Sequence, residues 1–87
     1  MNVLLVEDEM DFQRVLAEYL QLSGFEVFTA NHGKHGLEIF QKEHIDICIL
    51  DVMMPVMDGF AMAEKIRKTN KEIPVLFLTA KNQKEDK

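Results

Sequence analysis

The chain has 87 residues, a net charge of −5 and a single cysteine, so it is one domain at most and cannot form an internal disulfide. Apolar residues make up 47% and charged residues 29% of it, a balance that is typical of a globular domain and excludes a disordered one. Basic residues are scattered and no apolar segment is of membrane-spanning length. We therefore expect a cytoplasmic domain that contacts neither membrane nor nucleic acid through this segment.

Short apolar runs alternate with longer segments whose apolar residues recur every three or four positions, which predicts alternating strands and helices. The run Val3–Val6 is the first predicted strand. A helix follows from about Glu9 to Ser23, and Gly24 stands where a left-handed C-terminal cap is expected. The side chains predicted to face inward from this helix are Phe12, Val15, Leu16, Tyr19 and Leu20.

The middle of the chain repeats this pattern. Residues Phe25–Thr29 alternate and predict a second strand, after which Asn31 is a suitable N-cap for a second helix. This second helix is predicted to direct Leu37 and Phe40 inward, although two glycines weaken its helix propensity. The near-continuous apolar run Ile45–Leu50 then predicts a strand that is buried on both faces and includes Cys48 as a small hydrophobic residue.

A third helix is predicted behind the N-cap Asp58, with Phe60, Ala63 and Ile66 facing inward, and the last strand follows Pro74 and extends to Leu78. Connections of helix length require parallel strand pairing, and right-handed crossovers place helices on both faces of the sheet. The predicted fold is therefore α/β, with a doubly wound parallel sheet. The polar residues 81–87 are expected to begin another helix or to be a frayed end.

Polar side chains stand at the carboxyl ends of three predicted strands. Glu7 and Asp8 follow the first strand, Asp51 follows the third and Thr79 follows the last. Parallel strands lie about 4.8 Å apart and open α/β sheets bind ligands at this edge, so these groups are expected to meet there. Carboxylates with no histidine or cysteine beside them favour a hard cation, and Mg²⁺ above all.

This arrangement predicts a chemistry for Asp51. A carboxylate can accept a phosphoryl group to form an acyl phosphate, while a cation neutralises charge on the transferred oxygens. Thr79 would donate its hydroxyl to that group, and Met53 can direct its carbonyl at the metal and its N–H at a phosphoryl oxygen. Gly59 gives backbone freedom beside the N-cap. The alternative is structural: Glu7 and Asp8 cap the first helix and Asp51 only ends a strand.

These motifs resemble the receiver domains of two-component response regulators. The matching segments are Val6-Glu7-Asp8-Glu9, the stretch Asp51–Gly59 and Thr79-Ala80, in the same order and spacing, and they span residues 1–80. The resemblance implies the flavodoxin-like receiver fold. It also implies that Asp51 accepts a phosphoryl group from a histidine on a partner histidine kinase or phosphotransfer protein.

The same resemblance implies a ligand set and a switch. Mg²⁺ would be held by Asp8, Asp51 and the Met53 carbonyl, with Glu7 reaching the ion through water. Thr79, together with the Ala80 backbone N–H, would contact the phosphoryl group and report it to an output, which by analogy is most often transcriptional. The first helix would be the main surface for docking the kinase. No enzyme activity is implied beyond the domain's own phosphorylation and dephosphorylation.

The sequence departs from the family pattern after Lys87, where a fourth helix, a fifth strand ending in a lysine, and a fifth helix are expected. Lys81 cannot replace that lysine, because it lies only two residues beyond Thr79. The receiver fold is thus predicted to be incomplete at the C-terminus. Its fourth strand is expected to be an exposed apolar edge that makes the chain unstable alone or pairs it with a second copy as a homodimer or swapped dimer.

Three other functions compete. A Mg²⁺-dependent phosphohydrolase of the haloacid dehalogenase type requires a second aspartate two residues after the nucleophile, and Met53 occupies that position. A flavin-binding electron carrier needs a phosphate-binding loop where the chain is acidic. A receiver-like interaction fragment would keep the fold without phosphotransfer.

Two further groups of residues are expected to be solvated surface. They are the histidines 32, 35 and 44 and the basic end of the third helix, residues 67–71.

Overall fold

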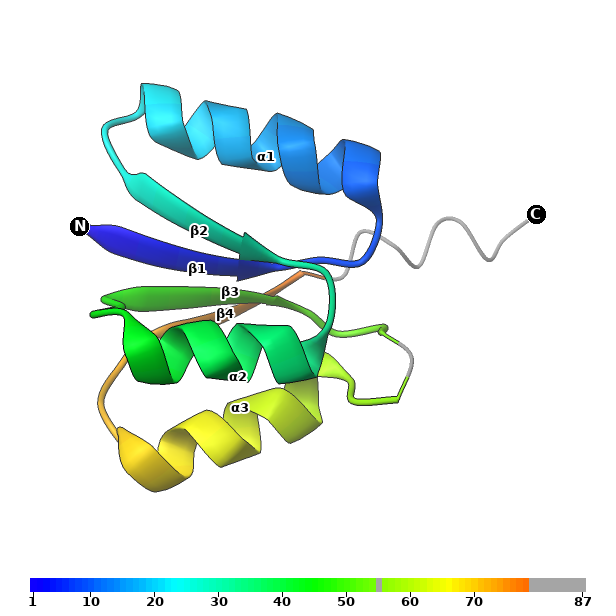
Figure 1. The fold of residues 1–87 in the computed structure, drawn as a ribbon, viewed down its shortest axis with the longest axis vertical. Coiled ribbons are helices and arrows are strands. Elements are labelled where there is room, and N and C mark those ends of the chain that lie inside the picture. The colour runs from blue at the N-terminus through cyan, green and yellow to red at the C-terminus, as the bar shows by residue number, and fades with distance from the viewer. Residues whose placement is uncertain (55, 79–87) are drawn as a thin grey trace.

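A computed structural model of the chain describes residues 1–54 and 56–78. These residues form a parallel sheet in the order β2-β1-β3-β4, with helices on both faces (Figure 1). The predicted doubly wound α/β fold is confirmed. The elements, in chain order, are β1 (Asn2–Val6), α1 (Met10–Leu22), β2 (Glu26–Ala30), α2 (Gly33–Lys42), β3 (Ile47–Asp51), α3 (Gly59–Thr69) and β4 (Val75–Leu78).

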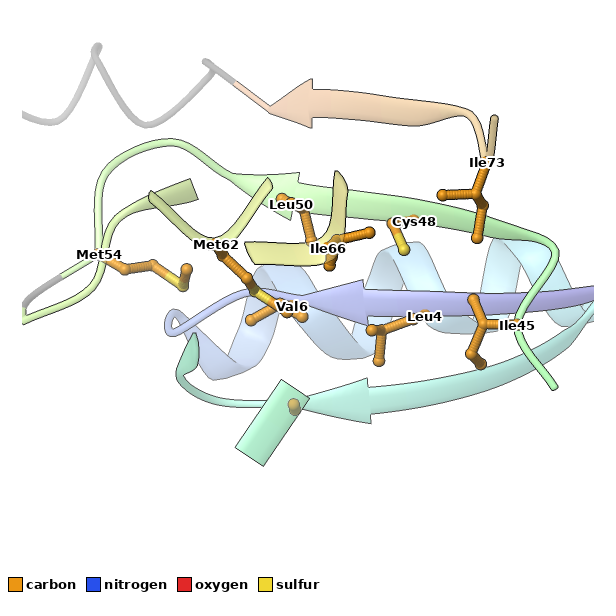
Figure 2. Close-up of a cluster of buried hydrophobic side chains, with 10 residues drawn as sticks. Leu4, Val6, Ile45, Cys48, Leu50, Met54, Met62, Ile66 and Ile73 are labelled. Atoms are coloured by element: carbon orange, nitrogen blue, oxygen red, sulfur yellow. The ribbon is translucent and has the colours of Figure 1, made fainter. Parts of the chain in front are cut away.

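The alternation of side chains along the strands divides the core into two layers. Val3, Leu5 and Ile49 point toward α1 on one face of the sheet. The other face packs against α2 and α3, which lie together on the opposite side of the sheet in Figure 1. Figure 2 shows this larger cluster, whose labelled members are Leu4, Val6, Ile45, Cys48, Leu50, Met54, Met62, Ile66 and Ile73. Both faces of β1 and β3 are therefore covered, which confirms the burial predicted for β3 from its apolar run.

Cys48 is fully buried in the larger core cluster, as predicted. Burial raises the pKa of its thiol to about 12, against a smaller lowering effect of the Arg67 charge. The thiol is therefore protonated at neutral pH and acts as a small apolar side chain.

Helix α1 begins and ends close to the predicted residues. The Glu9 side chain caps it by accepting the Phe12 N–H at 3.2 Å, and Gly24 adopts the expected left-handed conformation with φ of 100°. Its predicted inward face is wrong in part, because Val15 and Tyr19 are 60% and 66% exposed. The helix is rotated so that Gln13 turns inward, where its amide finds hydrogen-bond acceptors.

Helix α2 is capped by His32 rather than by the predicted Asn31. The His32 ring Nδ1 accepts the His35 N–H at 3.3 Å, whereas the Asn31 side chain accepts a hydrogen bond from Gln13. Leu37 and Phe40 pack on the core, as predicted. The glycines of this helix allow close packing: a Cβ at Gly36 would lie 2.6 Å from the Met62 Cε atom and 2.8 Å from the Val6 Cγ2 atom.

Asp58 caps helix α3 as predicted, by accepting the Ala61 N–H at 2.8 Å. The prediction that Phe60 faces inward is wrong, since Met62 and Ile66 fill the core while Phe60 is exposed and lies 4.8 Å from Phe77 between ring centres. The basic end of α3 is not simply solvated either: Arg67 donates to the main-chain carbonyls of Asn70 and Ile73. All three histidines are exposed, as predicted.

Strand β4 pairs with β3 and, within residues 1–54 and 56–78, with no other strand. Its side chains Leu76 and Phe77 are 52% and 39% exposed, so the predicted exposed apolar edge is confirmed for this part of the chain. No helix among the described residues is long and apolar enough to cross a membrane.

The amino ends of β1 and β3 are joined by reciprocal hydrogen bonds that fix their register. The Asn2 N–H donates to the Asp46 carboxylate at 2.7 Å, and the Asp46 N–H donates to the Asn2 carbonyl at 2.8 Å. The hydrogen bond from Asn2, with a contribution from His44, lowers the pKa of Asp46. The pairing of Val6 with Leu50 at the other end of these strands follows from the same register.

Candidate metal centre

The carboxyl ends of β1 and β3 bring three acidic side chains together. One carboxylate oxygen from each of Glu7, Asp8 and Asp51 lies within 4.8 Å of the other two. Asp51 is the last residue of β3 rather than the residue after it, and Glu7 follows β1 directly. The predicted meeting of these acids is confirmed. The predicted contributions of Thr79 and Ala80 fall outside the described residues.

The burial and the like charge of this cluster favour the binding of a cation. Glu7 and Asp51 are fully buried and Asp8 is partly buried. At separations below 4.8 Å, two carboxylates repel by on the order of 3 kcal/mol at an effective dielectric constant of about 20. The donors are all carboxylate oxygens, which is the set that a hard divalent cation prefers. The cluster can therefore bind a metal, and Mg²⁺ fits its chemistry.

Short-range hydrogen bonds orient two of the acids. The Glu7 Oε2 atom accepts the Glu9 N–H at 2.8 Å, and the Asp51 Oδ1 atom accepts the Met53 N–H at 3.0 Å. Because Glu9 supplies the N-cap of α1, the structural alternative in which Glu7 and Asp8 cap that helix is wrong. The Met53 N–H lies beside the Asp51 carboxylate, while the predicted roles of Met53 toward a metal and a phosphoryl group stay predictions.

Gly59 is needed for close approach rather than for backbone freedom. A Cβ at this position would lie 2.5 Å from the Asp51 carbonyl oxygen and 3.0 Å from the Val52 Cα atom. The Gly59 N–H donates to the Val52 carbonyl at 3.1 Å, so the first turn of α3 rests directly on the end of β3. The absence of a side chain thus allows α3 to begin in direct contact with the Asp51 main chain.

The segment between β3 and α3 is attached to the core by methionines. Met54 is buried among the core residues and Met57 packs against the same cluster. Val56 is fully exposed and has a left-handed backbone with φ of 70°, a conformation that β-branched residues rarely adopt. Met54 and Met57 thus attach the described parts of this segment to the core.

Gln13 is a residue at this edge that the sequence reasoning missed. Its side-chain Nε2 donates to the carbonyls of Glu7 and Ala30, at 2.9 and 3.1 Å, and to the Asn31 Oδ1 atom at 3.1 Å. A signal for it exists in the sequence: positions 13, 16, 17 and 20 have the spacing of one helix face, and only position 13 is polar. A polar residue in an otherwise apolar stripe indicates a buried hydrogen-bonding role.

A doubly wound parallel sheet with an acidic cluster at its carboxyl edge defines a flavodoxin-like α/β protein with a candidate cation site. The response regulator receiver domain family matches the chain over residues 3–87, and the chain belongs to this family. The cluster of Glu7, Asp8 and Asp51 resembles the phosphoacceptor site of these domains. The family that the motifs indicated is therefore confirmed.

Curated relatives with similar sequences are transcriptional regulators. The chain is 44% identical over 86 residues to the transcriptional regulatory protein RprY of Bacteroides fragilis, covering 99% of this chain and 36% of the relative. It is 43% identical over 79 residues to the probable transcriptional regulator ycf27 of Cyanophora paradoxa, covering 91% of this chain and 33% of the relative. The chain thus spans about a third of the length of these relatives.

Solved structures give the same result. The response regulator TrrA of Thermotoga maritima, in complex with Mg²⁺ and BeF, superimposes with a TM-score of 0.87 at 38% identity, over 91% of this chain and 69% of that one. TrrA in complex with the histidine kinase ThkA superimposes with a TM-score of 0.84 at 38% identity, over 91% of this chain and 68% of the other. The predicted receiver fold is confirmed.

The contact at Gly59 yields a first prediction. In Gly59→Ala, the added methyl group must displace either the end of β3 or the first turn of α3, since its neighbour is a main-chain carbonyl. We expect the free energy of unfolding to fall by about 1–3 kcal/mol, measured by urea denaturation. Glu64→Ala, on an exposed position of α3, is the control and should change stability by less than about 0.5 kcal/mol. A Gly59→Ala variant as stable as the wild type would contradict the assigned contact.

Proposed function

We propose that this chain is a phosphoacceptor module of two-component signal transduction, in which Asp51 takes a phosphoryl group from a partner histidine in a Mg²⁺-dependent reaction. The observation that carries this proposal is the meeting of Glu7, Asp8 and Asp51 within 4.8 Å at the carboxyl edge of a receiver fold. In this arrangement the carboxylate of Asp51 would be the nucleophile, and the three acids together would supply ligands for the cation that the reaction needs.

The transfer step is a nucleophilic displacement at phosphorus. An Asp51 carboxylate oxygen forms a bond to the phosphorus atom while the bond between phosphorus and the donor imidazole nitrogen breaks. The electron pair of that bond stays on the imidazole, which takes up a proton, and the product is an acyl phosphate. A bound Mg²⁺ would neutralise charge on the transferred oxygens.

Each acid has a proposed role toward the ion. Asp8 and Asp51 would bind it directly together with the Met53 carbonyl, and Glu7 would contact it through a water molecule. The Met53 N–H donates to Asp51 Oδ1 at 3.0 Å, which supports a role in which it would donate to a phosphoryl oxygen attached to the same carboxylate. Thr79 and Ala80 complete the proposed site as the phosphoryl contact and switch. The fit of an all-carboxylate donor set to a hard cation supports this assignment.

The proposed partner is a histidine kinase or a phosphotransfer protein. The complex of the similar TrrA protein with histidine kinase ThkA supports this choice. The transcriptional names of the curated relatives support a transcriptional output, and a cytoplasmic location belongs to the same proposal. The chain would be no enzyme toward other substrates. A phosphohydrolase would need an acid at position 53, where the chain has a methionine.

Phosphorylation at one residue is the direct test. The complete natural protein that contains this chain should gain the mass of one phosphoryl group when incubated with a small-molecule phosphodonor and Mg²⁺, and the adduct should be absent after chelation with EDTA. Asp51→Asn should abolish the adduct because an amide oxygen is a poor nucleophile. Asp58→Asn is the matched control, since asparagine caps a helix as well as aspartate, and it should be phosphorylated like the wild type. An adduct that persists in Asp51→Asn would refute the assignment.

A second candidate function is self-association through β4, for which the exposed Leu76 and Phe77 are the supporting observation. We propose that the 87-residue chain pairs with a second copy, or exchanges a segment with it, at this edge. Sedimentation velocity should show a dimer that Leu76→Lys dissociates. The control Leu22→Lys places the same substitution at a position of α1 that is 88% exposed and should leave the dimer intact. A monomeric wild-type chain that unfolds cooperatively would exclude this candidate.

A further inference from the structure

We propose that Gln13 is a positioning residue that sets the cation affinity of the acid cluster by fixing the peptide that joins Glu7 to Asp8. This inference rests on the proposed function of that cluster. It starts from burial: Glu7, Gln13 and Asp51 are the buried polar side chains of the described residues, and Gln13 lies at the same edge of the sheet as the two acids.

The Gln13 amide connects three elements at a single point. Its side chain comes from the end of the first turn of α1 and is 6% exposed. It donates to the carbonyl of Glu7 after β1 and to the carbonyl of Ala30 at the end of β2. The Ala30 carbonyl also accepts the Glu7 N–H at 3.0 Å. Both main-chain polar groups of Glu7 are thereby tied to fixed neighbours. An uncompensated buried amide is costly, so these bonds account for its burial.

The hydrogen bond from Gln13 acts on the proposed metal ligands through the planar peptide group between Glu7 and Asp8. The Glu7 carbonyl and the Asp8 N–H belong to the same peptide plane, so a hydrogen bond to the carbonyl fixes the direction in which the chain leaves β1 toward Asp8. The Glu7 side chain is held separately, through its Oε2 atom and the Glu9 N–H. Rotation of the peptide plane would move the Asp8 carboxylate relative to Asp51, and carboxylates that must converge on one cation depend on such outer contacts.

Gln13→Leu tests this role, because leucine fills a similar volume and donates no hydrogen bond. In the complete natural protein, we expect Mg²⁺ affinity measured by isothermal titration calorimetry to fall on the order of ten-fold. In the metal-free protein, hydrogen exchange at the Glu7 and Asp8 amides should be faster than in the wild type. Phosphorylation by a small-molecule phosphodonor should return to near the wild-type rate at saturating Mg²⁺, since Asp51 itself is unchanged.

Two controls separate positioning from general stability. Gln21→Leu makes the same substitution at an exposed position of α1 and should leave both Mg²⁺ affinity and amide exchange unchanged. Asn31→Ala removes one of the three acceptors of the Gln13 amide and keeps the hydrogen bond to the Glu7 carbonyl. Its Mg²⁺ affinity should therefore stay within about two-fold of the wild type, a much smaller loss than that of Gln13→Leu.

The outcomes distinguish this inference from the proposed function. A wild-type protein that binds no Mg²⁺ would overturn both the proposed function and the role of Gln13 in it. A wild type that binds Mg²⁺, with a folded Gln13→Leu variant that binds it equally well, would overturn the inference about Gln13 alone. A lower melting temperature with unchanged Mg²⁺ affinity would assign Gln13 a purely structural role and also overturn the inference.

Discussion

Two fully buried carboxylates, Glu7 and Asp51, stand at the ends of neighbouring parallel strands, and a third, Asp8, lies within 4.8 Å of them. Like charges at this separation repel, and the pairing of Val6 with Leu50 holds the ends of the two strands that carry them side by side. A divalent cation bound by the three carboxylates would offset this repulsion. The register of β1 and β3 therefore brings the acids together, and packing of the core offsets the repulsion between their charges.

The surroundings of the site limit its freedom to relax. Gly59 allows α3 to rest on the Asp51 carbonyl, and Gly36 allows α2 to approach Met62 and Val6 on the same layer of the core. On the other face, Gln13 of α1 ties the end of β1 to the end of β2. Close contacts from both layers thus converge on the strand ends that hold the acids. Rigid elements of this kind hold a site more accurately than loops do.

The sequence was sufficient to predict the strands, the layer order and the meeting of the acids, because buried parallel strands are apolar runs and their polar ends must share an edge. It was insufficient for the rotation of α1. The spacing of Val15 and Tyr19 fits a helical period just as that of the core-facing residues does, although both side chains are exposed. Only packing against the sheet decides which of the two overlapping helix faces turns inward. The His32 cap and the exposed Phe60 were missed for a related reason: main-chain geometry at a helix start decides which side chain can reach back or turn inward.

The central claim is that these acids form a cation site, and the stability of the protein with and without Mg²⁺ tests it most directly. Thermal unfolding of the complete natural protein should show stabilisation by Mg²⁺, about 2.7 kcal/mol at a concentration one hundred times the dissociation constant. Asp51→Asn replaces one of the three carboxylates that would hold the ion, so the variant should gain little stability from Mg²⁺. Equal stabilisation of both proteins by Mg²⁺, or none of the wild type, would contradict the claim.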